Sequence, residues 1–344
     1  MPTDFNECAC CNPPWQSTKF YNTPVTNYYT IRRLTPDLDH VWSRIRSDNI
    51  NSIAKALTVD SDDKLWVGGN ASATTRYKSN GVVDYEISGT AFDVLSLDID
   101  SSGYMYAGGR TLGDENLIKY SPDLTEDWAV FASDTYVLDL DTDDHFERIF
   151  TIGHSAFQSY ITEYDKSDGS QLQHEDMLNN WSVGLVGGVV AEEYDISVVD
   201  DTHFWVTSAV LDNTKFNVSE HSGVFNIPTN QNYFPSGVPY DISIDSSGAL
   251  VTCGSDRVIK HHKNDLGSVM WVSDTYVGSF DKNSLAIDTN DDIYVAGGSG
   301  VFKVNGQTGE LIGNAFYHGQ EVLDITLDSS NNVYICGVAS SDKF

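Results

Sequence analysis

Three aspartates hold the same place in three repeated segments, directly before an Ile-Ser or Ile-Thr pair. They are Asp195, Asp241 and Asp324, and Asp93 and Asp139 lie nearby in their own repeats. Each begins an apolar alternating stretch, as expected of an innermost strand that lines a central channel. Carboxylates that converge at one channel mouth can bind a divalent cation or raise one another's pKa for acid–base chemistry. The same aspartates can instead cap neighbouring backbone, so a site and a structural role both stay open.

A second candidate site lies near the N-terminus, where Cys8, Cys10 and Cys11 place three thiols within four residues. Zinc sites favour cysteine pairs separated by two to four residues, so this spacing needs ligands from another segment or another chain. Disulfides to a partner subunit and free thiols are the other interpretations. The cluster is therefore a candidate for metal binding or disulfide formation.

The two remaining cysteines predict no chemistry. Cys253 and Cys336 fill the position that Ala107 and Ala296 fill in other repeats. Small buried side chains are expected there.

The N-terminal cysteines belong to residues 1–27, a segment that differs in character from the rest of the chain. It lacks apolar periodicity and combines prolines with aromatic side chains, which predicts an irregular arm. Trp15, Phe20 and Tyr21 are the side chains expected to anchor this arm on a partner.

The rest of the chain repeats one hairpin. An apolar alternating strand runs into an Asp-Ser-Ser-type turn, and a second strand ends in small residues, often Gly-Gly. The turn aspartates are Asp60, Asp100, Asp141, Asp200, Asp245, Asp288 and Asp328, with gaps of 40, 41, 59, 45, 43 and 40 residues. This period is typical of four-stranded propeller blades. The longest gap predicts an insertion within residues 171–194, whose Trp181 is a further candidate partner contact.

The chain ends together supply one blade. Leu323–Val338 begins a blade that the last residues are too few to complete, and Ile31–Trp42 resembles Leu117–Trp128, the back half of a complete blade. We therefore predict an all-β, seven-bladed propeller of four-stranded antiparallel blades over residues 28–344. N-terminal strands are expected to complete the C-terminal blade and close the ring.

The clearest repeat reads Ile-Asp-Thr-Asn-Asp-Asp-Ile-Tyr-Val-Ala-Gly-Gly from Ile287, followed by Lys-x-x-x-x-Thr-Gly from Lys303. These repeats resemble the PQQ-like and NHL-like propeller superfamily over about residues 28–338. The resemblance implies the fold and leaves the activity open. Many such propellers are binding platforms, whereas a minority are quinoprotein dehydrogenases, lactonases or lyases.

The sequence gives little evidence for a quinone cofactor, for EF-hand calcium sites or for the common catalytic motifs. A quinoprotein usually has eight blades, the tryptophans here do not form a docking repeat, and the adjacent pair Cys10-Cys11 lies in the arm rather than over a central cavity. The Asp-rich turns lack the 12-residue loop ending in Glu of an EF-hand, so capped turns are expected rather than calcium sites. Phosphate-binding loops, nucleophile elbows and His-Glu-x-x-His motifs are absent from the sequence. A divalent cation at the channel mouth is the one cofactor candidate that stays open.

The charge pattern limits the partners. The formal net charge is −30, whereas residues 1–46 hold five basic and four acidic side chains. Such an acidic body repels nucleic acid and anionic lipid and attracts cations or basic partners. The sequence contains no run of 18 apolar residues, so it predicts no membrane-spanning segment. The N-terminus lacks the features of a signal peptide, so we expect synthesis in the cytosol, with a virion as a candidate destination.

These observations favour a non-enzymatic interaction propeller, attached to a larger assembly by its N-terminal arm. By analogy, a bacteriophage virion component of the tail or capsid, with a ligand on the host surface, fits this description. The alternative is a metal-dependent hydrolase or lyase acting through Asp195, Asp241 and Asp324.

Overall fold

Described residues of the computed structural model run from 27 to 340 with gaps. They are residues 27–46, 52–70, 73–88, 92–111, 116–131, 136–144, 147–154, 159–176, 194–200, 203–210, 215–222, 228–233, 239–254, 257–262, 265–273, 283–298, 300–317 and 320–340. All regular elements in these ranges are β-strands, which confirms the all-β prediction. No helix within them is long and apolar enough to cross a bilayer.

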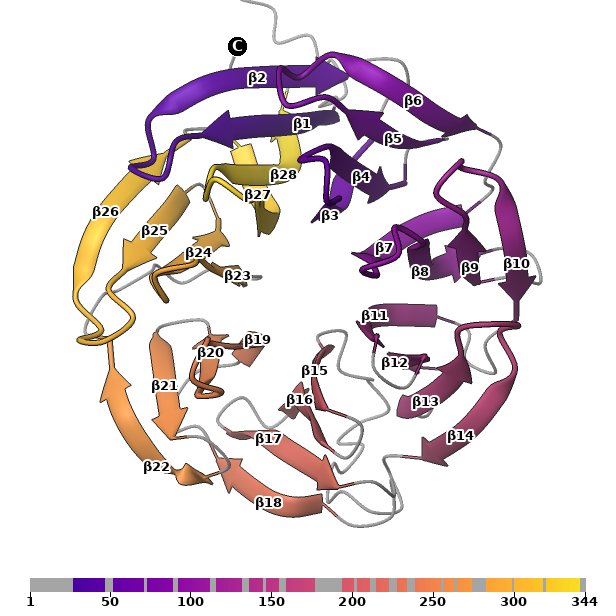
Figure 1. Ribbon diagram of the computed structural model, residues 1–344. Coiled ribbons are helices and arrows are strands. Elements are labelled where there is room, and N and C mark those ends of the chain that lie inside the picture. Colours follow the sequence, from indigo (N-terminus) through magenta and orange to yellow (C-terminus); the bar gives the residue numbers. More distant parts are fainter. Residues whose placement is uncertain are drawn as a thin grey trace, which may run out of the picture.

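The described strands form seven four-stranded antiparallel blades around a common axis (Figure 1). Blades 1 to 3 are β3 (Ala54–Val59), β4 (Leu65–Gly69), β5 (Ala73–Tyr77), β6 (Val83–Ser88); β7 (Phe92–Ile99), β8 (Met105–Thr111), β9 (Leu117–Tyr120), β10 (Glu126–Val130); and β11 (Tyr136–Asp143), β12 (Arg148–His154), β13 (Ser159–Asp165), β14 (Gln171–Asp176). Blades 2 and 3 also share one bridge, between Arg110 and Tyr136.

The remaining blades repeat this order from the axis outward. Blades 4 to 6 are β15 (Tyr194–Asp200), β16 (His203–Val210), β17 (Lys215–Ser222), β18 (Pro228–Tyr233); β19 (Pro239–Ile244), β20 (Leu250–Gly254), β21 (Val258–His262), β22 (Asp265–Val272); and β23 (Asn283–Ile287), β24 (Ile293–Gly297), β25 (Gly300–Val304), β26 (Leu311–Phe316). Blade 7 joins β27 (Gln320–Leu327) and β28 (Val333–Ser340) to β1 (Asn27–Leu34) and β2 (His40–Arg46).

Blade 7 confirms the predicted ring closure. Its strand order is β2-β1-β28-β27, so both chain ends contribute to one sheet. Strand β1 pairs along its whole length with β28, and Ile31 lies opposite Cys336. The ring is therefore closed by a continuous antiparallel ladder.

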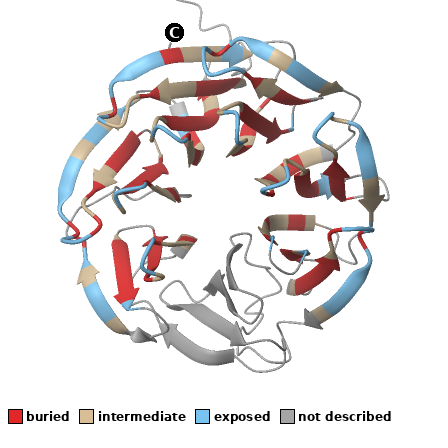
Figure 2. Cartoon of the chain, in the orientation of Figure 1, coloured by how far each residue is buried: buried red, intermediate tan, exposed pale blue. Residues whose placement is uncertain are grey.

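The core lies between blades rather than within them. Five apolar clusters of the described residues each join two neighbouring blades. One of them packs Tyr29, Ile31 and Trp42 of blade 7 against Leu57 and Leu65 of blade 1. Burial accordingly falls from the inner strands to the outer ones (Figure 2). At these five junctions the described blades bury their apolar faces against a neighbour, as expected of repeats that share a core.

Five of the turn aspartates are Asx caps, as expected, namely Asp60, Asp100, Asp245, Asp288 and Asp328. In Asp288, Oδ1 accepts the backbone N–H groups of Asn290 and Asp292 at 2.8 and 2.9 Å. Asp60 makes the same two bonds in blade 1, to Asp62 and Lys64. These oxygens are occupied by the turn itself, which accounts for the residue pattern that superficially suggests calcium loops.

Blade 3 differs from the predicted register. Asp141 lies inside β11, opposite Phe150, and is not the turn residue. Asp143 ends the strand and is 7 % exposed, like the turn aspartates of other blades. The sequence Asp-x-Asp at 141–143 offers two choices for the turn, and the apolar spacing alone did not separate them.

Three tryptophans recur at blade junctions, so the expectation that they form no docking repeat is wrong. Each indole Nε1 donates to a backbone carbonyl in the outer turn of the next blade: Trp42 to Ser79, Trp128 to Lys166 and Trp271 to Gly306, at 2.9–3.1 Å. Each ring also covers a glycine with positive φ, namely Gly81, Gly169 or Gly309. The recurrence is hard to see in the sequence because the equivalent positions of the other four blades hold Tyr85, Gln173, Asn230 and Gly313.

We predict that Gly309→Ala lowers the free energy of unfolding by about 2–4 kcal/mol. An added Cβ would lie 2.7 Å from Cε3 of Trp271, and φ is +75°. Gly103→Ala is the matched control, because φ is +83° but the nearest atom, Cγ of Pro122, is 3.7 Å away. It should cost only the left-handed penalty, about 1 kcal/mol. Urea unfolding of both variants measures the difference, and equal losses would contradict the tryptophan contact.

Candidate functional site in the inner ring

The three predicted aspartates do share one position. Strand pairing places Asp195 opposite Thr207, Asp241 opposite Cys253 and Asp324 opposite Cys336. The equivalent residues of the other blades complete what we call the inner ring, which consists of Ala56, Ser96, Asp139, Asp195, Asp241, Ser284 and Asp324. In five blades the strand register shifts directly before the ring residue. Such bulges re-aim a side chain.

Asp324 connects three blades. Its Oδ2 accepts the backbone N–H of Leu57 in blade 1 at 2.6 Å. Its Oδ1 accepts the hydroxyl of Ser284 in blade 6 at 2.8 Å and the backbone N–H of Ile325 at 2.8 Å. Both carboxylate oxygens therefore act as acceptors within the protein.

Other ring members follow the same rule. Asp241 accepts the backbone N–H of Leu285 in the next blade at 2.7 Å. Ser96 accepts the N–H of Leu140 at 3.2 Å and donates its hydroxyl to Asp139 at 2.6 Å. A ring residue thus binds the backbone of the following blade. Of the two roles that the sequence leaves open, backbone capping is the one that these contacts display.

Asp324 is a weaker acid than an ordinary aspartate. Burial raises the pKa of its carboxyl, the hydrogen bonds from Ser284, Leu57 and Ile325 lower it, and the Asp241 carboxylate raises it, which gives a net pKa of about 7. Asp324 is partly buried. A carboxyl of this kind can exchange a proton near neutrality. Among the ring residues whose side chains are described, Asp324 is therefore a candidate for acid–base chemistry near neutral pH.

The facing cysteines are structural. Cys253 and Cys336 are free and buried, and burial raises the pKa of both thiols well above the ordinary value. Ala296 shares their position opposite a ring residue, as predicted, but Ala107 does not, because it lies opposite Leu97. Gly108 is the residue opposite Ser96, because it lies eight residues after the turn residue Asp100, as Cys253, Ala296 and Cys336 do after theirs.

Residues described by the structure contain no group of three His, Cys, Asp or Glu side chains arranged to hold a metal. The other candidate residues lie outside the described ranges and stay predictions: Cys8, Cys10, Cys11, Trp15, Phe20, Tyr21 and Trp181. Only the backbone of Asp195 is described. Strand β14 covers the start of the expected insertion, as an ordinary outer strand.

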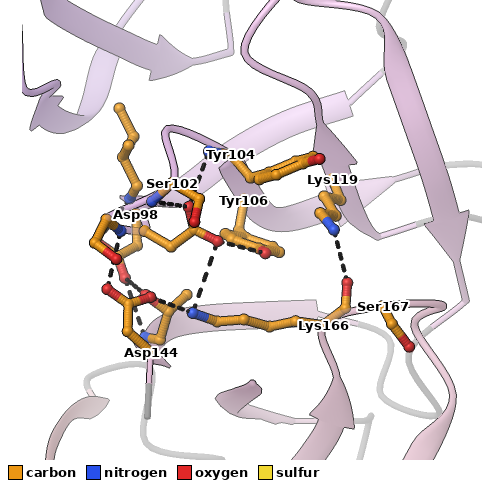
Figure 3. Close-up of polar contacts among 12 residues, drawn as sticks. Asp98, Ser102, Tyr104, Tyr106, Lys119, Asp144, Lys166 and Ser167 are labelled. Carbon is orange, nitrogen blue, oxygen red and sulfur yellow. Dashed lines mark hydrogen bonds and ion pairs between the residues drawn. The ribbon is translucent and has the colours of Figure 1, made fainter. Parts of the chain in front are cut away.

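An ionic cluster around the buried Lys166, between blades 2 and 3, was missed by the sequence interpretation (Figure 3). Lys166 has a 1 % exposed side chain, with Nζ 2.6 Å from Oδ1 of Asp144 and 3.8 Å from Oδ2 of Asp100. Lys119 donates to the carbonyl of Lys166 at 2.8 Å. Burial opposes ionisation of Asp144, but bonds from Lys166 and Ser101 outweigh it and hold its pKa below the ordinary value. The cluster is a saturated contact between blades.

Lys166 carries no distinguishing local signal in the sequence. Its outer turn resembles those around Ser79 and Gly306, whose carbonyls accept similar bonds. Only the packed arrangement of two blades reveals that its ammonium group is enclosed.

No protein-family model and no curated protein matches this chain. Among solved structures, it is similar to the WD40 β-propeller domain of Doa1, with a TM-score of 0.63 and 12 % identity over 84 % of this chain and 93 % of that one. It is also similar to virginiamycin B lyase from Staphylococcus aureus, with a TM-score of 0.59 and 11 % identity over 90 % of this chain and 99 % of that one. The chain is a β-propeller. At these identities the likeness concerns the fold, and the finer PQQ-like or NHL-like assignment stays a prediction.

We predict that Asp324→Asn flattens the pH dependence of stability between about pH 4 and pH 7. The folded protein holds this carboxyl's proton more tightly than the unfolded chain, since its pKa is raised to about 7. Its contribution to stability is therefore fully present at low pH and is lost as pH rises toward and through 7. Urea unfolding at pH 5 and pH 8 tests this.

Asp84→Asn is the control with the opposite sign. Despite partial burial, the Arg76 guanidinium lowers the pKa of Asp84. Its contribution is present above the ordinary pKa and is lost on acidification. Asp84→Asn should therefore leave the change between pH 5 and pH 8 intact. An unchanged pH profile in Asp324→Asn would refute the buried-carboxyl interpretation.

Proposed function

We propose that this protein is a non-enzymatic interaction propeller that acts as a scaffold within a larger assembly. The observation that supports it is the use of the inner-ring carboxylates. Asp241 and Asp324 accept backbone N–H groups of the following blades, and Asp139 accepts a hydroxyl from the preceding one. Their oxygens thereby strengthen the ring, and the rims and turns of the blades are the surfaces available to partners.

Attachment through residues 1–27 is the second part of this proposal. The segment leads directly into β1, which lies between β28 and β2 and pairs with both. A load on the segment would be carried by a strand held on two sides. The cysteines at positions 8, 10 and 11 and the aromatic residues Trp15, Phe20 and Tyr21 supply the contact groups.

The proposed assembly is a bacteriophage virion, with the propeller on the tail or capsid and in contact with a host-surface ligand. The acidic composition supports protein partners over nucleic acid or anionic membranes. This assignment rests on analogy with acidic, β-rich virion components.

Deleting residues 1–26 should leave a folded propeller that no longer joins its assembly, because the cut stops before β1. Circular dichroism and sedimentation test the fold, and mass spectrometry of purified particles tests incorporation. A larger deletion, of residues 1–34, is the control that removes β1 and should prevent ring closure. Normal incorporation of the chain lacking residues 1–26 would reject attachment through the arm.

A metal-dependent hydrolase or lyase is the second candidate, favoured by the near-neutral pKa of Asp324. On this hypothesis Asp195, Asp241 and Asp324 bind a divalent cation at the inner ring. Calorimetry with calcium and manganese should then detect binding by the parent protein and none by the variant with all three replaced by Asn. Absence of binding by the parent protein would end this hypothesis.

A further inference from the structure

Strand β26 is an outer edge strand without a charged residue. Its sequence is Leu-Ile-Gly-Asn-Ala-Phe, and Leu311, Ile312 and Phe316 are 40, 49 and 55 % exposed. Most other outer strands carry charges: β2 has Arg44 and Arg46, β6 has Asp84 and Glu86, β10 has Glu126 and Asp127, β14 has Glu175 and Asp176, and β22 has Asp265. Strand β18 is also uncharged, but it begins with proline and is otherwise polar apart from Tyr233. Apolar, uncharged character is thus particular to β26.

Register shows which charges β26 lacks. Strands β6 and β26 occupy the same place in blades 1 and 6, and each has a bulge at its start. Ile312 occupies the bulge position that Asp84 occupies in β6. At the next two alternate positions along the strand, β26 has Asn314 and Phe316 where β6 has Glu86 and Ser88. Asp84 and Glu86 form ion pairs with Arg76 and Arg46.

Edge strands present unpaired N–H and C=O groups, and proteins usually guard them with charges. Strand β26 lacks that protection and adds apolar side chains. The neighbouring outer strand β22 also exposes Val269, Met270 and Val272, by 39–46 %. Trp271 joins the two strands by covering Gly309 at the turn before β26. The rim of blades 5 and 6 is therefore an apolar strip.

We propose that β26 binds a second copy of this chain, edge to edge, as an antiparallel pair about a two-fold axis. A two-fold contact places the same patch opposite itself, so each residue faces the same small set of residues on the partner. Like charges in facing positions destabilise a strand pair. An uncharged, apolar edge meets this condition, whereas the charged outer strands bring their own like charges together.

The net charge of the whole chain also favours β26 as the surface where two copies make contact. With a formal charge of −30, two copies repel each other over most approaches. Contact is expected where local charge is absent and apolar area compensates for the repulsion, as along β26. Salt screens repulsion between exposed charges but leaves apolar burial intact. The dimer should consequently become tighter as salt increases, opposite to an association driven by ion pairs.

Ile312→Asp tests the surface by placing on β26 the charge that β6 carries. Val83→Asp on β6 is the matched control, since Val83 is 47 % and Ile312 is 49 % exposed. Both variants add one negative charge at an exposed site and should fold like the parent. Sedimentation equilibrium at about 0.05 M and about 0.5 M NaCl measures the dimer dissociation constant.

The parent protein should dimerise at least about tenfold more tightly at the higher salt, and Ile312→Asp should weaken the dimer by at least about tenfold. Val83→Asp should change it by less than about threefold. Hydrogen exchange of β26 amides should slow with protein concentration in the parent protein only. A parent protein that stays monomeric at both salts would overturn the proposal. So would a dimer that Ile312→Asp leaves intact, or one that both variants weaken equally.

Discussion

Closure of the ring by β1 is the constraint on which the rest of the structure depends. Five junctions between described blades are apolar clusters, so a blade at an open end would expose one such face to water. The ladder between β1 and β28 removes that end and brings Tyr29 and Ile31 against Leu57 and Leu65 of blade 1. Asp324 strengthens the same junction by accepting the N–H of Leu57. Sequence-distant segments are thus held together at one place by backbone pairing, apolar packing and the hydrogen-bonded, partly buried carboxyl group of Asp324.

The acidic composition is compatible with this fold because several basic side chains are placed inside the blades. The chain has 20 Lys and Arg residues against 50 Asp and Glu residues. Lys260 Nζ lies 2.6 Å from Oδ2 of the buried turn residue Asp245, and both side chains are almost fully enclosed. Arg33 and Asp328 make a longer pair in blade 7. A buried carboxylate needs such a partner, whereas exposed acids are solvated without one. Internal pairing of cations leaves the outer surface strongly negative.

The sequence predicted the features that depend on local chemistry, such as turns and strand alternation. It did not predict the features that depend on contacts with a neighbouring blade. Asp-Ser-Ser turns and apolar alternation follow from turn chemistry and strand pleating, and they identified the blades, the ring closure and the shared position of Asp195, Asp241 and Asp324. The expected position of Ala107 is wrong by one residue, because the spacing from the turn aspartate matches Gly108, and not Ala107, to Cys253 and Cys336. The partners of Trp128 and Lys166 lie in the next blade, which no single repeat reveals. Segments outside the described ranges hold the remaining candidates.

Variation among blades separates positions that hold the ring together from positions that are free to serve partners. At the inner ring, Ala56, Ser96 and Asp324 differ in polarity, and the polar ones bond the following blade. At the outer junctions, Trp42 and Trp128 donate to the next blade, whereas Gly313 at the equivalent place leaves room for Leu38. These departures have structural explanations. The apolar side chains of Ile312 and Phe316 are different, because about half of each is exposed to solvent. Burial against another surface would explain their presence on a rim where most other outer strands carry charges.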